Sequence, residues 1–293
     1  MAQGTSGLNL IEAMHARFGG GELGKDPDAV DPAALRRCAG WTRLFFGRDR
    51  YFELDAQGWE HLPDTASMIV SNHSGGTSIP DAWGLVVSWY QHVGFQRPLL
   101  MMGHDMVFAI KGLGEAFERV GVMRAGRVAA RRALGEQGRD LLVFPGGDRD
   151  TWRPFSQRYA VRFSGRRGYA RIAVEAGVPI VPVAHVGAHH TLVVLTDGEK
   201  MARRMGLPAL ARATIFPVHL SLPWGLAIGP MPHLPPPTTL HYRIRPPEHP
   251  DPTLEPEAAA ADLDARVRAS IQAGLDQLRA ERRAAKQERR RRR

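Results

Sequence analysis

The segment from Ser71 to Asp81 holds residues whose types and spacing suit acid–base chemistry. It lies between a short apolar run, expected to be a buried strand, and a helical pattern. His73 suits the role of a general base because imidazole titrates near neutral pH. Asp81 is the nearest carboxylate downstream, and a carboxylate that accepts the Nδ1 proton fixes the tautomer and stabilises the imidazolium. Gly75 and Gly76 permit the tight backbone that brings both groups together, and they leave room for a bulky substrate.

Three further blocks follow the His73 block in the sequence. They read Val-Gly-Val-Met-Arg at 120–124, Val-Phe-Pro-Gly-Gly-Asp at 143–148 and Gly-Val-Pro-Ile-Val-Pro-Val at 177–183. The order and spacing of the four blocks resemble the glycerolipid acyltransferase superfamily, which includes the lysophosphatidic acid acyltransferases. The resemblance covers about residues 51–186, and it implies an α/β acyltransferase fold.

The resemblance implies an O-acyltransferase of phospholipid or other lipid synthesis. A fatty acyl group would pass from acyl-CoA or acyl-carrier protein to the hydroxyl of a glycerolipid or lysophospholipid acceptor. His73 would be the general base, Asp81 its orienting acid, and Arg124 a clamp for an acceptor phosphate, since guanidinium binds phosphate oxygens in a fork. The remaining predicted substrate-binding residues are Ser74, Gly75, Gly76, Phe144, Pro145, Gly146, Gly147 and Asp148. No cofactor and no metal is expected besides the acyl-donor co-substrate.

Two departures from the family pattern bear on this prediction. The family pair is His-(x)4-Asp, whereas here Ser78 stands at the fifth position after His73 and the carboxylate comes only at Asp81. The third block reads Phe-Pro-Gly-Gly where lysophosphatidate enzymes have Phe-Pro-Glu-Gly, and this variant resembles mono- and diacylglycerol acyltransferases. The acceptor therefore stays open. Backbone N–H groups at 74–76 or 146–147 are candidates to stabilise an oxyanion, at roughly 3 to 4 kcal/mol for each well-placed donor.

The elements that must position these residues alternate between short apolar runs and helical patterns. Such alternation predicts a single α/β domain with a largely parallel central sheet flanked by helices. Strands are expected at 67–71, 98–102, 141–144, 179–183 and 240–244. Helices are expected at 8–18, 33–46, 81–90, 107–117, 125–137, 168–176 and 256–278. The predicted organisation is an N-terminal helical, membrane-associating segment at 1–50, the acyltransferase domain at 51–280 and a disordered basic tail at 281–293.

Charge and composition indicate the partners. The formal net charge is +9, and most of the 39 basic residues are arginine. Such a surface favours phosphate-rich partners, and with the acyltransferase resemblance we expect an anionic membrane and no nucleic acid. The single cysteine, Cys38, excludes an intramolecular disulfide. No run reaches the roughly 18 apolar residues of a spanning helix, and we see no signal peptide. A peripheral location on the cytoplasmic face is expected, while the oligomeric state is not predicted.

Three other functions fit parts of the sequence. A serine hydrolase would use Ser74 at a strand-to-helix turn, although the nucleophile elbow has Gly where Asn72 stands. A metal-dependent glycosyltransferase would use Asp148 and Asp150 as an Asp-x-Asp triplet. The third is a basic module that binds membrane or nucleic acid without catalysis. The uncharged, proline-rich segment at 213–237 could line an acyl channel, touch a membrane or form ordinary loops.

Overall fold

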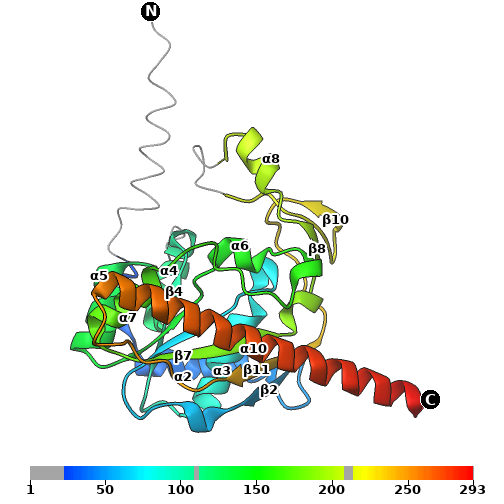
Figure 1. The fold of residues 1–293 in the computed structure, drawn as a ribbon. Coiled ribbons are helices and arrows are strands. Elements are labelled where there is room, and N and C mark those ends of the chain that lie inside the picture. Colours follow the sequence, from blue (N-terminus) through cyan, green and yellow to red (C-terminus); the bar gives the residue numbers. More distant parts are fainter. Residues whose placement is uncertain (1–22, 109–111, 208–213, 293) are drawn as a thin grey trace, which may run out of the picture.

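The computed structural model describes residues 23–108, 112–207 and 214–292 of the 293-residue chain. An α/β body is crossed on one side by a long C-terminal helix, and a small separate sheet lies beside the body (Figure 1). The helix predicted at 8–18 lies outside the described residues.

An eight-stranded sheet forms the centre of the body. In spatial order its strands are β1 (Phe46–Gly47), β2 (Phe52–Gln57), β11 (Thr238–Ile244), β7 (Ile180–Val186), β3 (Met68–Ser71), β6 (Asp140–Val143), β4 (Leu99–Gly103) and β5 (Val122–Arg124). All neighbours pair in parallel except β11 and β7, which are antiparallel. The predicted α/β fold with a largely parallel sheet is confirmed. Strands β1, β2 and β5 were not predicted, because β1 and β5 are very short and β2, the strand next to the sheet edge, carries polar residues.

Helices cover both faces of this sheet. The α-helices beside it are α2 (Pro32–Thr42), α3 (Pro80–His92), α4 (Leu113–Arg119), α5 (Arg127–Arg131), α6 (Gly147–Thr151), α7 (Gly168–Ala176) and α10 (Pro256–Arg291). Short 3-10 turns are η1 (Pro27–Ala29), η2 (Trp59–His61), η3 (Gly76–Ser78), η4 (Asp105–Phe108), η6 (Phe155–Gln157) and η7 (Ala188–His190), and a π-helical turn, η5, spans Arg132–Glu136. The predicted helices at 81–90 and 168–176 agree closely with α3 and α7.

Alternate side chains of the inner strands enter two separate cores. Met68 and Val70 of β3 pack with residues of α5, α7 and α10, whereas Ile69 packs with α2 and α3 on the other face. Period-two alternation across a sheet produces this division. The residue Leu35 of α2 belongs to the second core, so α2 is packed against the body, and β1 extends the central sheet within the predicted N-terminal segment 1–50.

The helix α10 includes the helix predicted at 256–278, and it buries an apolar stripe against the sheet. Leu263, Val267, Ile271, Leu275 and Leu278 are all buried along it. The helix then continues to residue 291, where a disordered tail was expected from 281. Ala, Arg, Lys and Glu are strong helix formers, and i, i+4 pairs on exposed turns add support, which explains why the charged segment extends the helix.

Three other sequence-based expectations differ from the structure. The helix predicted at 33–46 ends at residue 42, because Phe46 enters strand β1. The segment 107–117 contains the end of η4 and the start of α4, on either side of residues outside the described part. The helix predicted at 125–137 becomes the short α5 followed by the π-helical turn.

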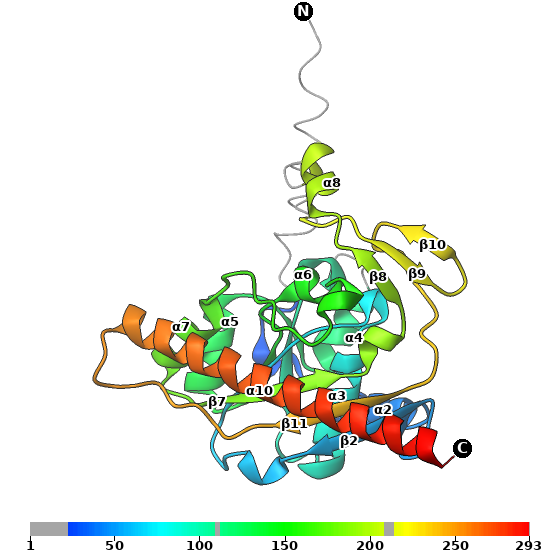
Figure 2. The same ribbon diagram turned by 45° about the vertical axis from the view of Figure 1, so that its right-hand side comes forward.

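A second, antiparallel sheet lies beside the body. It comprises β8 (Val193–Thr196), β9 (Val218–Ser221) and β10 (Gly225–Ile228), in the order β10-β9-β8, with the short helix α8 (Glu199–Arg204) between β8 and β9. Figure 2 shows this sheet projecting away from the central one. Much of the proline-rich segment 213–237 therefore consists of the β9–β10 hairpin and the irregular chain on either side of it. The composition of the segment did not predict this structure.

Candidate active site

His73 and Asp81 meet at the carboxyl end of strand β3. His73 follows β3, and Asp81 lies in the first turn of α3. The imidazole Nδ1 is 2.7 Å from Asp81 Oδ2, and the same oxygen accepts the N–H of Ser74 at 2.7 Å. Because a carboxylate only accepts hydrogen bonds, Nδ1 carries the proton. Nε2 then presents its lone pair, and it has no hydrogen-bond partner within the described part of the chain.

A compact loop brings the pair together despite the long spacing. Gly75 and Gly76 have φ of +100° and +63°, a left-handed conformation that glycine adopts without strain, and the turn η3 follows. A Cβ on Gly75 would lie 2.6 Å from Pro80 Cδ, so this position has no space for a side chain. The seven intervening residues therefore fold into a turn rather than separating His73 from Asp81.

Asp81 is buried yet keeps its charge. Burial on its own raises the pKa of this carboxyl, but the facing His73 and the Ser74 amide lower it, and the net pKa lies below its ordinary value. The Asp81 carbonyl also accepts the Tyr242 hydroxyl at 2.8 Å, which ties the start of α3 to β11. The His73 side chain retains 12% exposure, so it is reachable from solvent.

The third sequence block contributes a ring and a carboxylate to the His73 loop. The Phe144 ring stacks on the His73 ring, with centroids 4.4 Å apart. Asp150 Oδ2 accepts the His73 backbone N–H at 2.6 Å, and its other oxygen is paired with Arg153 in a fully buried ion pair. Burial raises the pKa of Asp150, although Arg153 and the His73 amide oppose the shift. Sequence reasoning considered Asp150 only as part of an Asp-x-Asp triplet.

Two other residues of the third block, Gly146 and Asp148, have different surroundings. Asp148 accepts from Thr214 Oγ1 at 3.0 Å and from the Arg166 guanidinium at 3.2 Å. A Cβ on Gly146 would lie 2.3 Å from the Asp150 Cβ, so glycine is needed for this close approach. The two carboxylates of the triplet therefore engage different partners, which does not favour a shared metal ion.

Backbone amides divide into occupied and available donors. The N–H groups of His73 and Ser74 donate to Asp150 and Asp81, and Gly147 donates to the Phe144 carbonyl. Among the described residues no hydrogen bond is recorded for the N–H groups of Gly75, Gly76 and Gly146. Of the amides predicted to stabilise an oxyanion, these three are the ones free to do so.

Two histidines that sequence reasoning did not place at this site lie beside it. His233, from the chain after β10, has Nε2 3.1 Å from Ser78 Oγ and also lies against Gly76. His185 of β7 is fully buried near Asp81, and burial lowers its pKa to about 4. Both histidines are more than 100 residues from His73 in the sequence, so the sequence did not indicate that they lie near it. Among the described residues the buried Ser74 hydroxyl has no hydrogen-bond partner, so it has no base there of the kind that a serine nucleophile requires.

Arg124 occupies the end of strand β5, separated from β3 by β4 and β6. Its guanidinium donates to the Leu23 carbonyl at 2.7 Å and to Asp105 at 3.1 Å, and it lies over the Phe108 ring. Its side chain is 8% exposed. Binding an acceptor phosphate would require Arg124 to give up part of this network.

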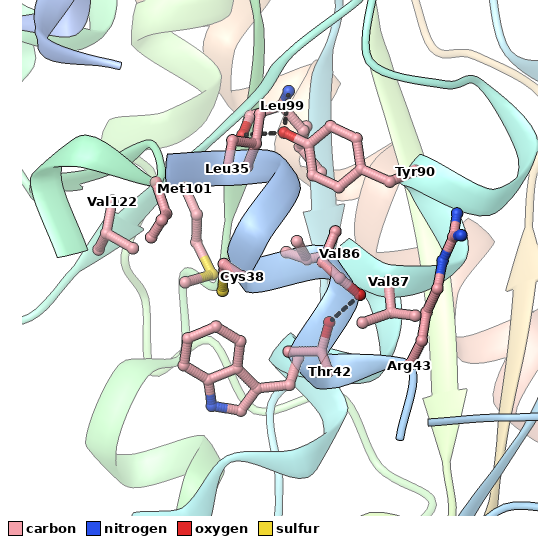
Figure 3. A pocket seen from close by; sticks show the side chains of 13 residues that line it. Leu35, Cys38, Thr42, Arg43, Val86, Val87, Tyr90, Leu99, Met101 and Val122 are labelled. Atoms are coloured by element: carbon pink, nitrogen blue, oxygen red, sulfur yellow. Dashed lines mark hydrogen bonds between the residues drawn. The ribbon is translucent and has the colours of Figure 1, made fainter. Parts of the chain in front are cut away.

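The small apolar pocket in Figure 3 is not large enough for a substrate. It lies between α2, α3 and strands β4 and β5, next to Cys38, and Tyr90 closes one side through hydrogen bonds with the Leu99 backbone. Its volume is about 30 Å³. That space holds about two water molecules and no acyl chain.

A family comparison matches the middle of the chain. Residues 53–186 match the sequence profile of the family described as Acyltransferase. These residues are therefore an acyltransferase-family segment. The matched segment runs from β2 to the end of β7, and it includes His73, Asp81 and Asp150. The β9–β10 hairpin and α10 lie outside it.

Several curated proteins are similar to this chain. An uncharacterized protein of Mycobacterium tuberculosis is 32% identical over 216 residues, covering 71% of this chain and 58% of that protein. An uncharacterized protein of Mycobacterium leprae is 31% identical over 216 residues, covering 71% of this chain and 57% of that protein. A Gallus gallus protein named "DGAT1/2-independent enzyme synthesizing storage lipids" is 28% identical over 182 residues, covering 60% of this chain and 53% of that protein. The chain thus spans a little over half the length of the curated relatives it matches.

Among solved structures, a 1-acyl-sn-glycerophosphate acyltransferase, PlsC, of Thermotoga maritima is similar with a TM-score of 0.48 and 18% sequence identity. The alignment covers 85% of this chain and 78% of that one. In the described part of the chain, no helix combines the length and the apolar character needed to cross a bilayer.

Proposed function

We propose that this protein transfers a fatty acyl group from acyl-CoA or acyl-carrier protein to the hydroxyl of a glycerolipid or lysophospholipid. His73 acts as the general base, and Asp81 orients it. The observation that carries the proposal is the 2.7 Å contact between His73 Nδ1 and Asp81 Oδ2 within the acyltransferase-family segment. The contact favours the tautomer in which Nδ1 carries the proton, and it leaves Nε2 of a partly exposed ring to act as the base despite the unusual spacing of the pair.

The proposed reaction needs one proton carrier and no covalent enzyme intermediate. His73 Nε2 takes the proton of the acceptor hydroxyl as its oxygen forms a bond with the thioester carbonyl carbon. The carbonyl oxygen becomes an oxyanion, and the available amides of Gly75, Gly76 or Gly146 are candidate donors to it. The tetrahedral species then breaks its C–S bond, and the imidazolium returns the proton to the departing thiolate.

Thiol release measures this reaction directly. Purified protein is given a panel of long-chain acyl-CoAs with lysophosphatidate, other lysophospholipids, monoacylglycerol or diacylglycerol as acceptor, and an acyl-carrier donor in parallel. We expect acceptor-dependent release that falls by at least about 10²-fold in His73→Ala, since general-base catalysis contributes about 10²–10⁴-fold. His249→Ala, which removes an exposed histidine elsewhere, is the matched control and should keep full activity. Unchanged turnover in a folded His73→Ala protein would remove the general-base role.

We also propose that the protein works peripherally on an anionic bilayer, on the cytoplasmic face. The β9–β10 hairpin supports this because apolar side chains cover its outer face and polar side chains lie on its buried face. Its outward side chains Leu220, Leu226 and Ile228 are 44%, 62% and 55% exposed, while His219 and Ser221 point inward and are buried. The whole segment 213–237 contains no Asp, Glu, Lys or Arg. An apolar outer face of this kind suits a hydrocarbon surrounding better than water.

A second exposed apolar patch lies around the end of α2. It consists of Trp41, Leu44 and Phe45 at the end of α2, and Tyr51, whose hydroxyl donates to the Pro235 carbonyl at 2.8 Å. Five exposed arginines accompany this patch: Arg36, Arg37, Arg43, Arg48 and Arg50. In the part of the chain that the structure describes, none of the five is in an ion pair. Unneutralised cations beside apolar side chains complement an acidic leaflet.

Vesicle co-sedimentation tests the proposed bilayer contact. Replacing Leu220, Leu226 and Ile228 together with Ser should lower partition onto phosphatidylglycerol-containing vesicles by at least about tenfold, given the apolar area these side chains offer. The control replaces Val128 and Leu254, which are 83% and 41% exposed elsewhere, with Ser. Equal binding of all three proteins would contradict the proposal. A change of oligomeric mass without a change in vesicle binding would assign the patch to a second copy of the chain instead.

A further inference from the structure

A large groove lies between the last turns of α10 and strands β2 and β11 of the central sheet. Its volume is about 610 Å³, which is within the range of small-molecule sites. Thr239 and His241 of β11 and Asp55 of β2 contribute to one wall, Tyr159 and His190 to another, and α10 to the third. Figure 1 shows the C-terminal turns of α10 projecting beyond the sheet.

The groove is strongly cationic. Six basic side chains line it: Arg158, Arg279, Arg282, Arg283, Lys286 and Arg289. Within the described residues none of them is paired with a carboxylate. The two carboxylates of the lining, Asp55 and Glu281, are already engaged by Arg243. A cluster of unpaired cations in a concave site favours a ligand that carries several negative charges.

Two of these cations are held in position by neighbouring groups. Arg282 donates to His190 Nε2 at 3.0 Å. Burial and the nearby Arg282 and Arg158 lower the pKa of His190 to about 4, so this ring is neutral and accepts the bond. Arg158 lies over the Phe155 ring, 4.2 Å from its centroid, and donates to the Phe155 carbonyl at 2.8 Å. These contacts order the guanidinium groups without neutralising them.

The turn η7 contacts both the groove and the His73 loop. Ala188, the first residue of η7, lies against Gly75 of that loop, and His190, the last, lines the groove. The groove and the His73 loop thus lie on either side of η7. A donor whose phosphates and reacting thioester stand at opposite ends of a long arm would have to bridge this turn.

We infer that this groove binds clustered phosphate esters, such as the nucleotide end of a coenzyme A thioester, and so holds the donor while its acyl end reaches His73. The role of the groove as a donor site rests on the proposed acyl transfer. The binding itself follows from the groove's shape and charge. Arginine suits this role because its planar fork matches phosphate oxygens. Phosphodiester headgroups of an acidic lipid offer the same chemistry and are the second source to test.

Titration calorimetry with adenosine 3′,5′-bisphosphate tests the groove without any turnover. The full chain is compared with Arg282→Gln/Arg289→Gln, which removes two charges of the groove. The matched control is Arg290→Gln/Arg291→Gln, which removes the same charge from the same helix outside the groove lining. We expect the groove variant to bind the nucleotide at least about tenfold more weakly, and the control to stay within about twofold. Melting temperatures check that both variants fold.

Vesicles containing phosphatidylglycerol form the second arm. Loss of nucleotide affinity confined to the groove variant supports the inference with the donor as the source. If the nucleotide does not bind but vesicle affinity falls only in the groove variant, the phosphate site stands with lipid as its ligand. If neither ligand distinguishes the groove variant from the control, the inference is overturned. Selective nucleotide binding in a protein that transfers no acyl group would count against the proposed function alone.

Discussion

Replacing Asp81 with Asn separates the charge of the orienting carboxylate from its geometry. Asp81 Oδ2 accepts two N–H groups, from His73 and Ser74, whereas the buried Oδ1 has no partner among the residues that the structure describes. The Asn oxygen should therefore occupy the Oδ2 position, with the amide NH2 where Oδ1 was. The imidazole keeps its hydrogen bond and its orientation, and only the negative charge beside it is lost.

The size of the effect follows from the charge that His73 develops in the transition state. The interaction between an imidazolium and a carboxylate about 4 Å apart is worth about 4 kcal/mol at an effective dielectric constant of 20. Asp81 is 1% exposed, so water screens this interaction little. Losing 4 kcal/mol of transition-state stabilisation lowers kcat/KM by about a thousandfold. Leaving the Asn NH2 unsatisfied should also cost about 1–3 kcal/mol of folding stability.

The assay is thiol release from acyl-CoA with the acceptor that supports turnover, measured for wild type, Asp81→Asn and His73→Ala. We expect Asp81→Asn to lose less activity than His73→Ala, which also removes the proton acceptor. Melting temperatures identify any loss that arises from unfolding. A folded Asp81→Asn protein within about threefold of wild type would refute the reasoning, and the orienting charge would have to come from another group.

Three further results are expected. Asp150→Asn should leave Arg153 buried without its partner and destabilise the fold by about 3–5 kcal/mol, measured as a lower urea midpoint; an unchanged midpoint would contradict this. Because burial lowers the pKa of His185 from 6.5 to about 4, the unfolded chain binds more protons between these values. The free energy of unfolding should therefore fall by about 3 kcal/mol as the pH drops through this window, and less in His185→Phe; parallel pH profiles would be inconsistent with it. Gly84→Ala would place a Cβ 2.4 Å from Tyr242 Oη, and overpacking should cost about 1–3 kcal/mol. Gly40→Ala, with open space around it, is the control, and equal melting temperatures for the two would contradict the packing argument.

Much of the candidate site was predictable because its parts lie close together in the sequence. His73 and Asp81 share one strand–turn–helix unit, and Phe144 follows a neighbouring parallel strand whose carboxyl end must reach the same edge of the sheet. Asp150 was not assigned to the His73 loop, because a triplet of acidic and basic residues does not indicate which carboxylate turns inward. The structure selects Asp150, which is buried, and directs Asp148 to Thr214 and Arg166.

The sequence by itself determined the α/β class, the inner strands, most of the helix α10 and the histidine on which the proposed chemistry depends. These features follow from hydrophobic periodicity and from motifs, both of which fit within a window of about ten to twenty residues. Tertiary structure decided which side of the 213–237 segment faces outward, and it placed His233 beside Gly76. It also assembled a cationic groove from β2, β11, η7 and α10. Such features depend on contacts between residues far apart in the chain, whose pairing is fixed only when the whole core closes.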